Sequence, residues 1–410
     1  MTRRGARDPA GRGQAGLNQY DLGTFNEATV IETIRQAGAI SRTEISLQTG
    51  LTQQSVSRIL RLLLERGLMI EEGPQRAERL GKPRTPIRMR AEAGHAVGIL
   101  VDPEVISLVL ADLDGHILAR AGIPLTPDLS PDALLDVLCD QVVQLRAGYP
   151  VDEKSFLGVG LAVPGPKTPD GQLLDLPLKE SWSNVPLRQL LEDRLGCQVV
   201  IEKDGTAAAI GERWVGRADR AQDFAYIYMG TGVGCGLILN GQVYSGATQN
   251  AGEFGQLVSV GIGQVHPDGR PQMVRELNPP VTLHEIAVEH GWQGSTAYPD
   301  LCAAAVSGDP AASAALERIA NVITAGVVSL VDLLDLELVV IGGPAFLPPI
   351  RRFVADVVTR GVNDYPIAHR ARTVVVAESL LEAEAAALGA ASMIFHMAFA
   401  PRAWGARLSR

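Results

Sequence analysis

The chain has 410 residues, 46% of them hydrophobic, and a net charge of −9 at neutral pH, which suggests two or three domains with ample core. It contains no apolar run near the roughly 18 residues of a membrane span, and residues 1–16 lack the apolar core of a signal peptide. The cysteines are widely spaced without a C-x-x-C pair (Cys139, Cys197, Cys235 and Cys302). We therefore expect a cytoplasmic protein without a cysteine metal cluster.

Charge is distributed unevenly along the chain. Residues 1–90 hold 15 Lys and Arg against 9 Asp and Glu, whereas the remainder holds 22 against 37. A basic N-terminal part joined to an acidic body indicates that only the N-terminal part contacts polyanions.

The basic part is predicted to begin with two helices. Residues 26–37 form the first, with three apolar side chains facing inward (Val30, Ile31 and Ile34). Ser41 and Glu44 fit a capping box at the start of the second, because the hydroxyl and the carboxylate can satisfy free amides there. On that short helix we expect Ile45 and Leu47 on the inner side.

A third helix follows a tight turn at Gly50 and begins after Thr52, covering residues 53–66. Its apolar side chains fall on one side (Val56, Ile59, Leu60 and Leu63), and its polar side chains point the other way. Gln, Ser and Arg side chains reach base edges and phosphates in a major groove. The pattern predicts a DNA-binding helix-turn-helix, with an ordinary amphipathic hairpin as the alternative. The candidate DNA-contacting residues here are Arg42, Thr52, Gln53, Gln54, Ser55, Ser57, Arg58 and Arg61.

Two short strands are predicted over 68–71 and 87–90, with a Gly-, Pro- and Arg-rich stretch between them. This is the pattern of a winged helix, whose wing lays basic side chains along DNA. Lys82 and Arg84 are the candidate wing contacts, and a solvated linker is the alternative.

From residue 94 onward, a three-stranded meander is followed by helices and strands, and a second meander over 224–244 is again followed by helices and strands. Two such halves in series predict a bilobal α/β body with a cleft between the lobes.

Several motifs, in this order and spacing, resemble the ROK family of repressors and sugar kinases, and specifically its repressor branch with an N-terminal winged helix. They are LGKPRTPIRM, GVGLAVPGP, IEKDGTAAAIGE, GTGVGCGLILNGQVYSGATQNAGEFGQ and LVVIGGP. The resemblance implies an actin-like, ribonuclease H-like sugar-kinase fold. We therefore divide the chain into a flexible basic tail (1–20), a winged helix-turn-helix (21–90) and a ROK-like domain for sugar sensing and oligomerisation (94–410).

Asp204 matches the family's catalytic aspartate, with a helix-capping role as the alternative, and residues 230–236 match a phosphate-binding hairpin. The family's first hairpin carries an Asp-x-Gly motif. Here Leu100 stands at that Asp, unless the alignment slips by two residues to Asp102, and a proline and a glutamate (Pro103 and Glu104) replace flexible glycine. We therefore expect no kinase activity and a vestigial Asp204.

The family's zinc site, a histidine and a cysteine trio, is altered because Gln256 replaces the histidine and no cysteine lies between Cys235 and Cys302. We predict no metal and no cofactor. Lys203 stands where the family has a sugar-contacting Asn, which suggests an acidic or phosphorylated sugar. The candidate ligand-binding residues are Trp182, Asn184, Lys203, Asp204, Glu253, Gln256 and Glu276, with a core position as the alternative for Trp182.

We therefore expect a transcriptional repressor of carbohydrate-related genes that binds an operator as a homodimer or homotetramer and senses a sugar or sugar derivative. Lobe closure on the sugar, transmitted through residues 88–98, is the expected coupling. An active sugar kinase with a DNA-binding head, and a DNA-binding regulator that senses no ligand, are the alternatives.

Overall fold

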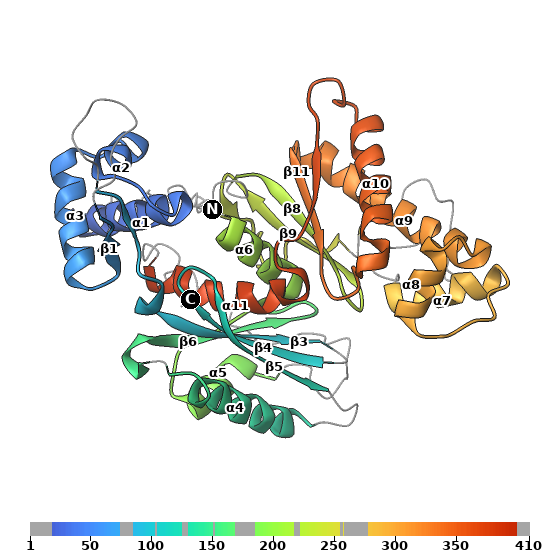
Figure 1. The fold of residues 1–410 in the computed structure, drawn as a ribbon, viewed down its shortest axis with the longest axis horizontal. Coiled ribbons are helices and arrows are strands. Elements are labelled where there is room, and N and C mark those ends of the chain that lie inside the picture. Colours follow the sequence, from blue (N-terminus) through green and yellow to red (C-terminus); the bar gives the residue numbers. More distant parts are fainter. Residues whose placement is uncertain are drawn as a thin grey trace, which may run out of the picture.

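The computed structural model describes residues 19–73, 85–102, 105–124, 130–150, 152–168, 185–216, 222–254, 257 and 278–399, with no side-chain description for residues 19–22. A small N-terminal domain, the head, lies at one end of a body made of two lobes (Figure 1). Helix and strand labels follow that figure.

The head contains three helices and a two-stranded sheet: α1 (Gln19–Ala37), α2 (Arg42–Thr49), α3 (Gln53–Glu65), β1 (Met69–Glu71) and β2 (Ile87–Met89). The strands pair antiparallel with Met69 opposite Met89, and Ile40 forms an isolated bridge to Ile87. The apolar stripes predicted for α1 and α3 are buried together in one core.

Local signals placed these helices correctly. The Ser41 hydroxyl accepts the Glu44 amide while the Glu44 carboxylate accepts the Ser41 amide, so the predicted capping box is confirmed. Gly50 ends α2 in the left-handed region at φ +71°. The Thr52 hydroxyl accepts the Ser55 amide at 3.2 Å and caps α3.

One expectation for α2 is wrong. Ile45 is fully buried, but Leu47 is 78% exposed. Residues two apart on an α-helix point roughly 200° away from each other, so a short helix cannot bury both against one partner. Leu47 therefore lies on the outer surface of the head.

The first lobe carries a five-stranded sheet in the order β5-β4-β3-β6-β7. Its strands are β3 (His95–Val101), β4 (Val105–Asp112), β5 (Ile117–Pro124), β6 (Phe156–Val163) and β7 (Val199–Lys203), with short 3-10 turns at Ala91–Ala93 and Glu153–Ser155. The helices α4 (Pro131–Ala147) and α5 (Leu187–Leu195) cover its outer face.

The second lobe repeats this order as β10-β9-β8-β11-β12. Its strands are β8 (Phe224–Met229), β9 (Val233–Leu239), β10 (Gln242–Val243), β11 (Leu338–Gly342) and β12 (Val375–Glu378). In both sheets an antiparallel meander is extended by two parallel strands. The helices α7 (Pro279–Glu289), α8 (Tyr298–Val306), α9 (Pro310–Leu334) and α10 (Pro348–Asp364) pack on its far face.

Two helices fill the space between the sheets: α6 (Asp204–Gly216) and α11 (Ala385–Phe399), the latter preceded by a 3-10 turn at Glu382–Glu384 (Figure 1). Their contacts leave no room for side chains. A Cβ on Gly160 of β6 would lie 1.8 Å from the Ala390 carbonyl oxygen, and one on Gly389 would lie 1.6 Å from that of Ala207. At these points the helices are in direct backbone contact with their neighbours.

Contrary to the expectation that no apolar stretch approaches the length of a membrane span, helix α9 is long and apolar enough to cross a membrane by composition, with a mean hydropathy of 1.5 over its most apolar stretch. More than half of that stretch is buried, and α9 packs with α7, α8 and α10 in the core of the second lobe. Its apolar character is that of a core helix.

Candidate nucleic-acid interface and ligand site

The outer face of α3 is a polar surface with nothing of the described protein packed on it. Gln53, Gln54, Ser57, Arg58 and Arg61 are exposed, whereas the opposite side of the helix is buried. The face has no acidic residue before Glu65 at the end of the helix. Helices that read the major groove present a polar, unpacked face of this kind.

Three other predicted DNA contacts on the head already have partners within the protein. Thr52 and Ser55 share the cap of α3, with their hydroxyl oxygens 3.0 Å apart. Arg42 forms an ion pair with Glu71 of β1. The strands β1 and β2 form the predicted hairpin, but its tip, with Lys82 and Arg84, lies outside the described residues.

Asp204 begins α6 directly after β7, and its carboxylate accepts the Gly205 amide at 2.6 Å. Burial is the main cause that raises the pKa of the Asp204 carboxyl to about 7. The Gly205 amide and the Lys203 ammonium oppose this increase, and the charges of Asp102 and Glu253 add to it. A carboxyl with its pKa raised in this way can accept a hydrogen bond from a hydroxyl when it is ionised, and can donate one when it is protonated. Asp102, Lys203, Asp204 and Glu253 are called the central site below.

The sequence offered two positions for the aspartate of the family's first hairpin, Leu100 and Asp102, and both lie near the end of β3. Leu100 is 3% exposed within the strand, paired with Ser107 of β4. Asp102 lies close enough to Asp204 and Tyr228 for its charge to raise the pKa of both groups. Asp102, and not Leu100, is therefore the acid beside Asp204.

Below the glycine-rich hairpin, the hydroxyl of Tyr228 is buried without a hydrogen-bond partner among the described residues. Burial raises the pKa of Tyr228 well above its ordinary value, and the charges of Asp204 and Asp102 add to this effect. A buried hydroxyl without a partner is unfavourable.

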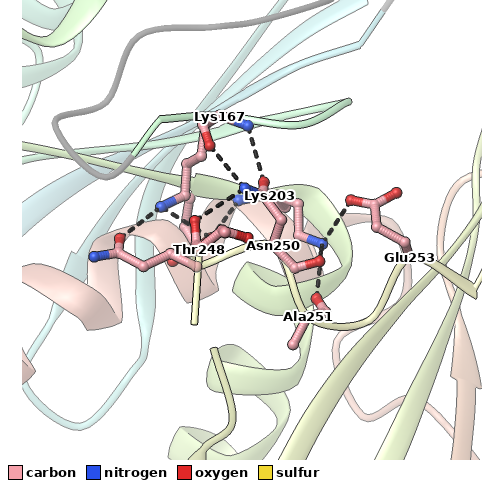
Figure 2. Close-up of polar contacts among 8 residues, drawn as sticks. Lys167, Lys203, Thr248, Asn250, Ala251 and Glu253 are labelled. Atoms are coloured by element: carbon pink, nitrogen blue, oxygen red, sulfur yellow. Dashed lines mark hydrogen bonds and ion pairs between the residues drawn. The ribbon is translucent and has the colours of Figure 1, made fainter. Parts of the chain in front are cut away.

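Lys203 connects the two lobes at the central site. Its ammonium donates to the carbonyl oxygens of Asn250 at 3.1 Å and Ala251 at 2.7 Å, and to the Glu253 carboxylate at 2.9 Å (Figure 2). These three residues belong to the loop that follows β10, so Lys203 and Glu253, both predicted as ligand contacts, lie in direct contact with each other. The contacts made by Lys203 are internal to the protein.

A second lysine, which the sequence analysis missed, supports the same loop. The Lys167 amide donates to the Asn250 side chain at 2.9 Å, and the Asn250 side chain donates back to the Lys167 carbonyl at 2.8 Å (Figure 2). The Lys167 ammonium donates to Gln249 and lies 3.5 Å from the Glu202 carboxylate. Lys167 follows the G-x-G-L-A-V-P-G-P motif, but nothing near it in the sequence indicates its partners.

The remaining predicted ligand contacts, Trp182, Asn184, Gln256 and Glu276, lie outside the described residues. Among the residues that the structure does describe, no three His, Cys, Asp or Glu side chains are grouped so as to hold a metal ion.

A contact between head and body was also absent from the sequence analysis. Arg213 near the end of α6 donates to the Glu32 carboxylate of α1 at 2.6 Å. Arg35 donates to Glu32 at 2.8 Å and to the Trp214 carbonyl at 2.8 Å, and its guanidinium stacks 4.6 Å from the Trp214 ring. Although burial acts in the opposite direction, the two arginines lower the pKa of Glu32 to about 2. The head is therefore held to the body by a partly buried ion pair between Glu32 and Arg213 and by the contacts of Arg35 with Trp214.

Comparison with known proteins assigns the family. Residues 97–396 match the ROK family. The chain belongs to the ROK family. It is 27% identical over 343 residues to the DNA-binding transcriptional dual regulator NagC of Escherichia coli K12, covering 81% of this chain and 83% of that protein. It is 28% identical over 238 residues to a xylose repressor of Caldicellulosiruptor bescii, covering 58% of this chain and 59% of the repressor.

Solved structures show the same fold. A ROK family transcriptional regulator, described as a homologue of the E. coli MLC protein, superposes with a TM-score of 0.76 at 20% identity, covering 95% of this chain and 100% of that one. A ROK family glucokinase from Streptomyces griseus superposes with a TM-score of 0.61 at 24% identity, covering 73% of this chain and 99% of the kinase. The expected actin-like bilobal body with an N-terminal helical domain is confirmed.

Proposed function

We propose that this ROK protein is a sugar-responsive, DNA-binding transcriptional repressor. The single observation that carries the proposal is the exposed outer face of α3, which has no acidic residue before Glu65 and is held by a capped turn. The similarity to NagC and to a xylose repressor over much of the chain supports it.

We infer that Gln54, Ser57 and Arg58 read bases in the major groove, while Arg61 and the wing residues Lys82 and Arg84 contact phosphates. Of the other candidates, Gln53 is exposed, but Arg42, Thr52 and Ser55 would have to exchange internal contacts for DNA. Two heads related by a two-fold axis in a homodimer or homotetramer would bind half-sites about 34 Å apart or a multiple of this spacing.

The effector is proposed to bind at the central site. Asp204 and the exposed part of Glu253 are acceptors for sugar hydroxyls. Trp182, Asn184, Gln256 and Glu276 remain proposed contacts on the strength of the sequence alone. Lys203, whose hydrogen bonds are internal, supports this site without binding an anionic group on the sugar.

We further propose that α6 carries the effector signal to the head. Its first residue, Asp204, lies at the central site, and its last turn holds Glu32 of α1 through Arg213. Because α6 is packed against α11 by backbone contact, a shift at one end moves the other end as well. The segment 88–98 is a second, covalent connection.

An operator-binding assay tests this function. DNA fragments selected by the purified protein are titrated by fluorescence anisotropy, with and without a panel of pentoses, hexoses and amino sugars. We expect nanomolar binding of a palindromic site and at least a tenfold change in affinity with one sugar. If no DNA sequence is preferred, the repressor function is wrong. If DNA binds specifically but no sugar acts, the sensing part is wrong and the ligand-independent regulator remains.

A sugar kinase is the second candidate, because Asp204 lies at a strand-to-helix junction of a sugar-kinase fold with a carboxyl pKa near neutrality. Pro103 and Glu104 in the first hairpin oppose it, since proline lacks an amide for a phosphate and glutamate repels one. Sugar-dependent ATP consumption that disappears in Asp204→Asn would establish the kinase. We expect none.

A further inference from the structure

Lys203 occupies an unusual position for a lysine. It is the last residue of β7, an edge strand of the first sheet, is only 6% exposed, and directly precedes the acid at the start of α6. An ammonium carries three hydrogens, and three oxygens of one loop lie within 3.1 Å of Lys203 Nζ. All of its hydrogen-bonding capacity is therefore used inside the protein.

The loop that receives these bonds is packed closely against its own lobe, the second. Gln249 has a positive φ of 63°, and at Gly252, where φ is +84°, a Cβ would lie 2.2 Å from the Cys235 carbonyl oxygen. The Ala251 amide donates to the Ser245 carbonyl at 3.0 Å. From the end of β7, the Lys203 ammonium donates hydrogen bonds to carbonyls of this loop, and these bonds cross the boundary between the lobes.

Glu253, at the end of the same loop, keeps 42% of its side-chain surface exposed, while one carboxylate oxygen is held by Lys203. The other oxygen is available to a ligand. A charge-assisted bond fixes the position of the carboxylate more firmly than a neutral contact would. The side chain that we expect to bind a sugar is thereby oriented by a residue of the opposite lobe.

We propose that Lys203 is a positioning residue: an internal cation that ties the Gln249–Glu253 loop to the first lobe and orients Glu253 for an uncharged polyol effector. The proposal rests on the proposed effector site. Lys167 also holds this loop to the first lobe through its own hydrogen bonds to Gln249 and Asn250. The Lys203 ammonium has no donor left for a ligand anion, and the Lys167 ammonium is buried beside the Glu202 carboxylate. Since the acid Asp204 also lies next to Lys203, acidic and phosphorylated sugars are disfavoured. This reverses the expectation drawn from Lys203 in the sequence alone.

The first experiment needs no effector. Hydrogen exchange of the Ala251 amide is measured in the full-length protein for the wild type, Lys203→Met and the control Lys154→Met, which removes an exposed lysine of the same lobe. We expect Lys203→Met to accelerate exchange at Ala251 at least about tenfold and the control to leave it unchanged. Lys203→Arg, which keeps a cation and its donors, is expected to restore much of the protection, and it serves as the reporter if Lys203→Met does not fold.

Unchanged exchange at Ala251 in a folded Lys203→Met protein would overturn the proposal. Equal acceleration in Lys203→Arg would overturn the role of the cation. Chelation with EDTA is expected to leave the exchange of the wild type unchanged. Accelerated exchange after chelation would show that a bound metal holds the loop instead.

The second experiment measures sugar binding by calorimetry with D-xylose, D-glucose, D-glucuronate and D-glucose 6-phosphate. We expect a neutral sugar to bind the wild type more tightly than either anion, and Lys203→Met to lose at least about tenfold in affinity. Glu253→Gln keeps the oxygen that accepts from Lys203, so it should keep Ala251 protected while binding the sugar more weakly. Tighter binding of an anionic sugar would refute the specificity.

Hydrogen exchange and calorimetry test the position of the loop and the binding of the sugar separately. If no sugar binds the wild type, the proposed effector function fails, while hydrogen exchange still decides whether Lys203 holds the loop. If Lys203→Met accelerates exchange but binds the sugar normally, the lysine does not position Glu253 and the proposal is wrong.

Discussion

The contact between head and body allows a quantitative prediction for Glu32→Gln. The lowering of the Glu32 pKa from 4.5 to about 2 corresponds to about 3 kcal/mol of stabilisation of its charged form. The Glu32 side chain is still 31% exposed, so we expect water to reduce the loss in Glu32→Gln to about 2 kcal/mol. Arg213, only 10% exposed, would remain in place without its charged partner.

The pH dependence has a defined sign. Because folding depresses the pKa of Glu32, its contribution is complete above the ordinary value of 4.5 and is lost as the pH falls toward about 2. Wild type and Glu32→Gln should therefore differ most near neutral pH, and the difference should shrink as the solution is acidified below 4.5.

Urea unfolding of the wild type, Glu32→Gln, Arg213→Met and the double variant gives the coupling energy between the two side chains. Glu27→Gln is the control, since it removes the more exposed Glu27–Arg66 pair within the head and should cost less than about 1 kcal/mol. A coupling energy near zero between Glu32 and Arg213 would refute the reasoning. Loss of the sugar effect on operator binding in Arg213→Met, with normal affinity for each ligand alone, would support signalling through α6.

Three further predictions concern the DNA face, the central site and the interlobe packing. Arg58→Ala should weaken operator binding by about 1–3 kcal/mol in an anisotropy titration, and an equal loss on unrelated DNA would assign Arg58 to phosphate instead. Sugar affinity should rise from about pH 6 to about pH 8 as Asp204 ionises and becomes a better acceptor, and a dependence that persists in Asp204→Asn would contradict this. Gly160→Ala, whose Cβ would lie 1.8 Å from the Ala390 carbonyl, should lower the unfolding free energy by about 3 kcal/mol, whereas Gly122→Ala, with open space around it, should be nearly neutral.

The sequence was most informative where structure depends on neighbouring residues. The capping box of Ser41 and Glu44, the Thr52 cap and the apolar stripe of α3 are read from residues three or four apart, and all are confirmed. Leu47 shows the limit, because its exposure depends on which single face of a short helix is packed. The sequence did not indicate the helices α7, α8 and α10. They are held largely by contacts with α9 and the second sheet, which the sequence does not reveal.

By itself, the sequence determined the helix-turn-helix, the ROK-like order of motifs and the presence of Asp204 at a strand-to-helix junction. Only the tertiary structure decided that Asp102 lies beside Asp204. It also decided that Lys203 donates its hydrogen bonds to a loop about 50 residues away, and that Arg213 pairs with Glu32 across 181 positions. Caps and amphipathic periodicity act within a few residues along one helix. A buried charge, in contrast, is stabilised by whichever partner the folded chain brings to it, and sequence separation carries no information about that partner.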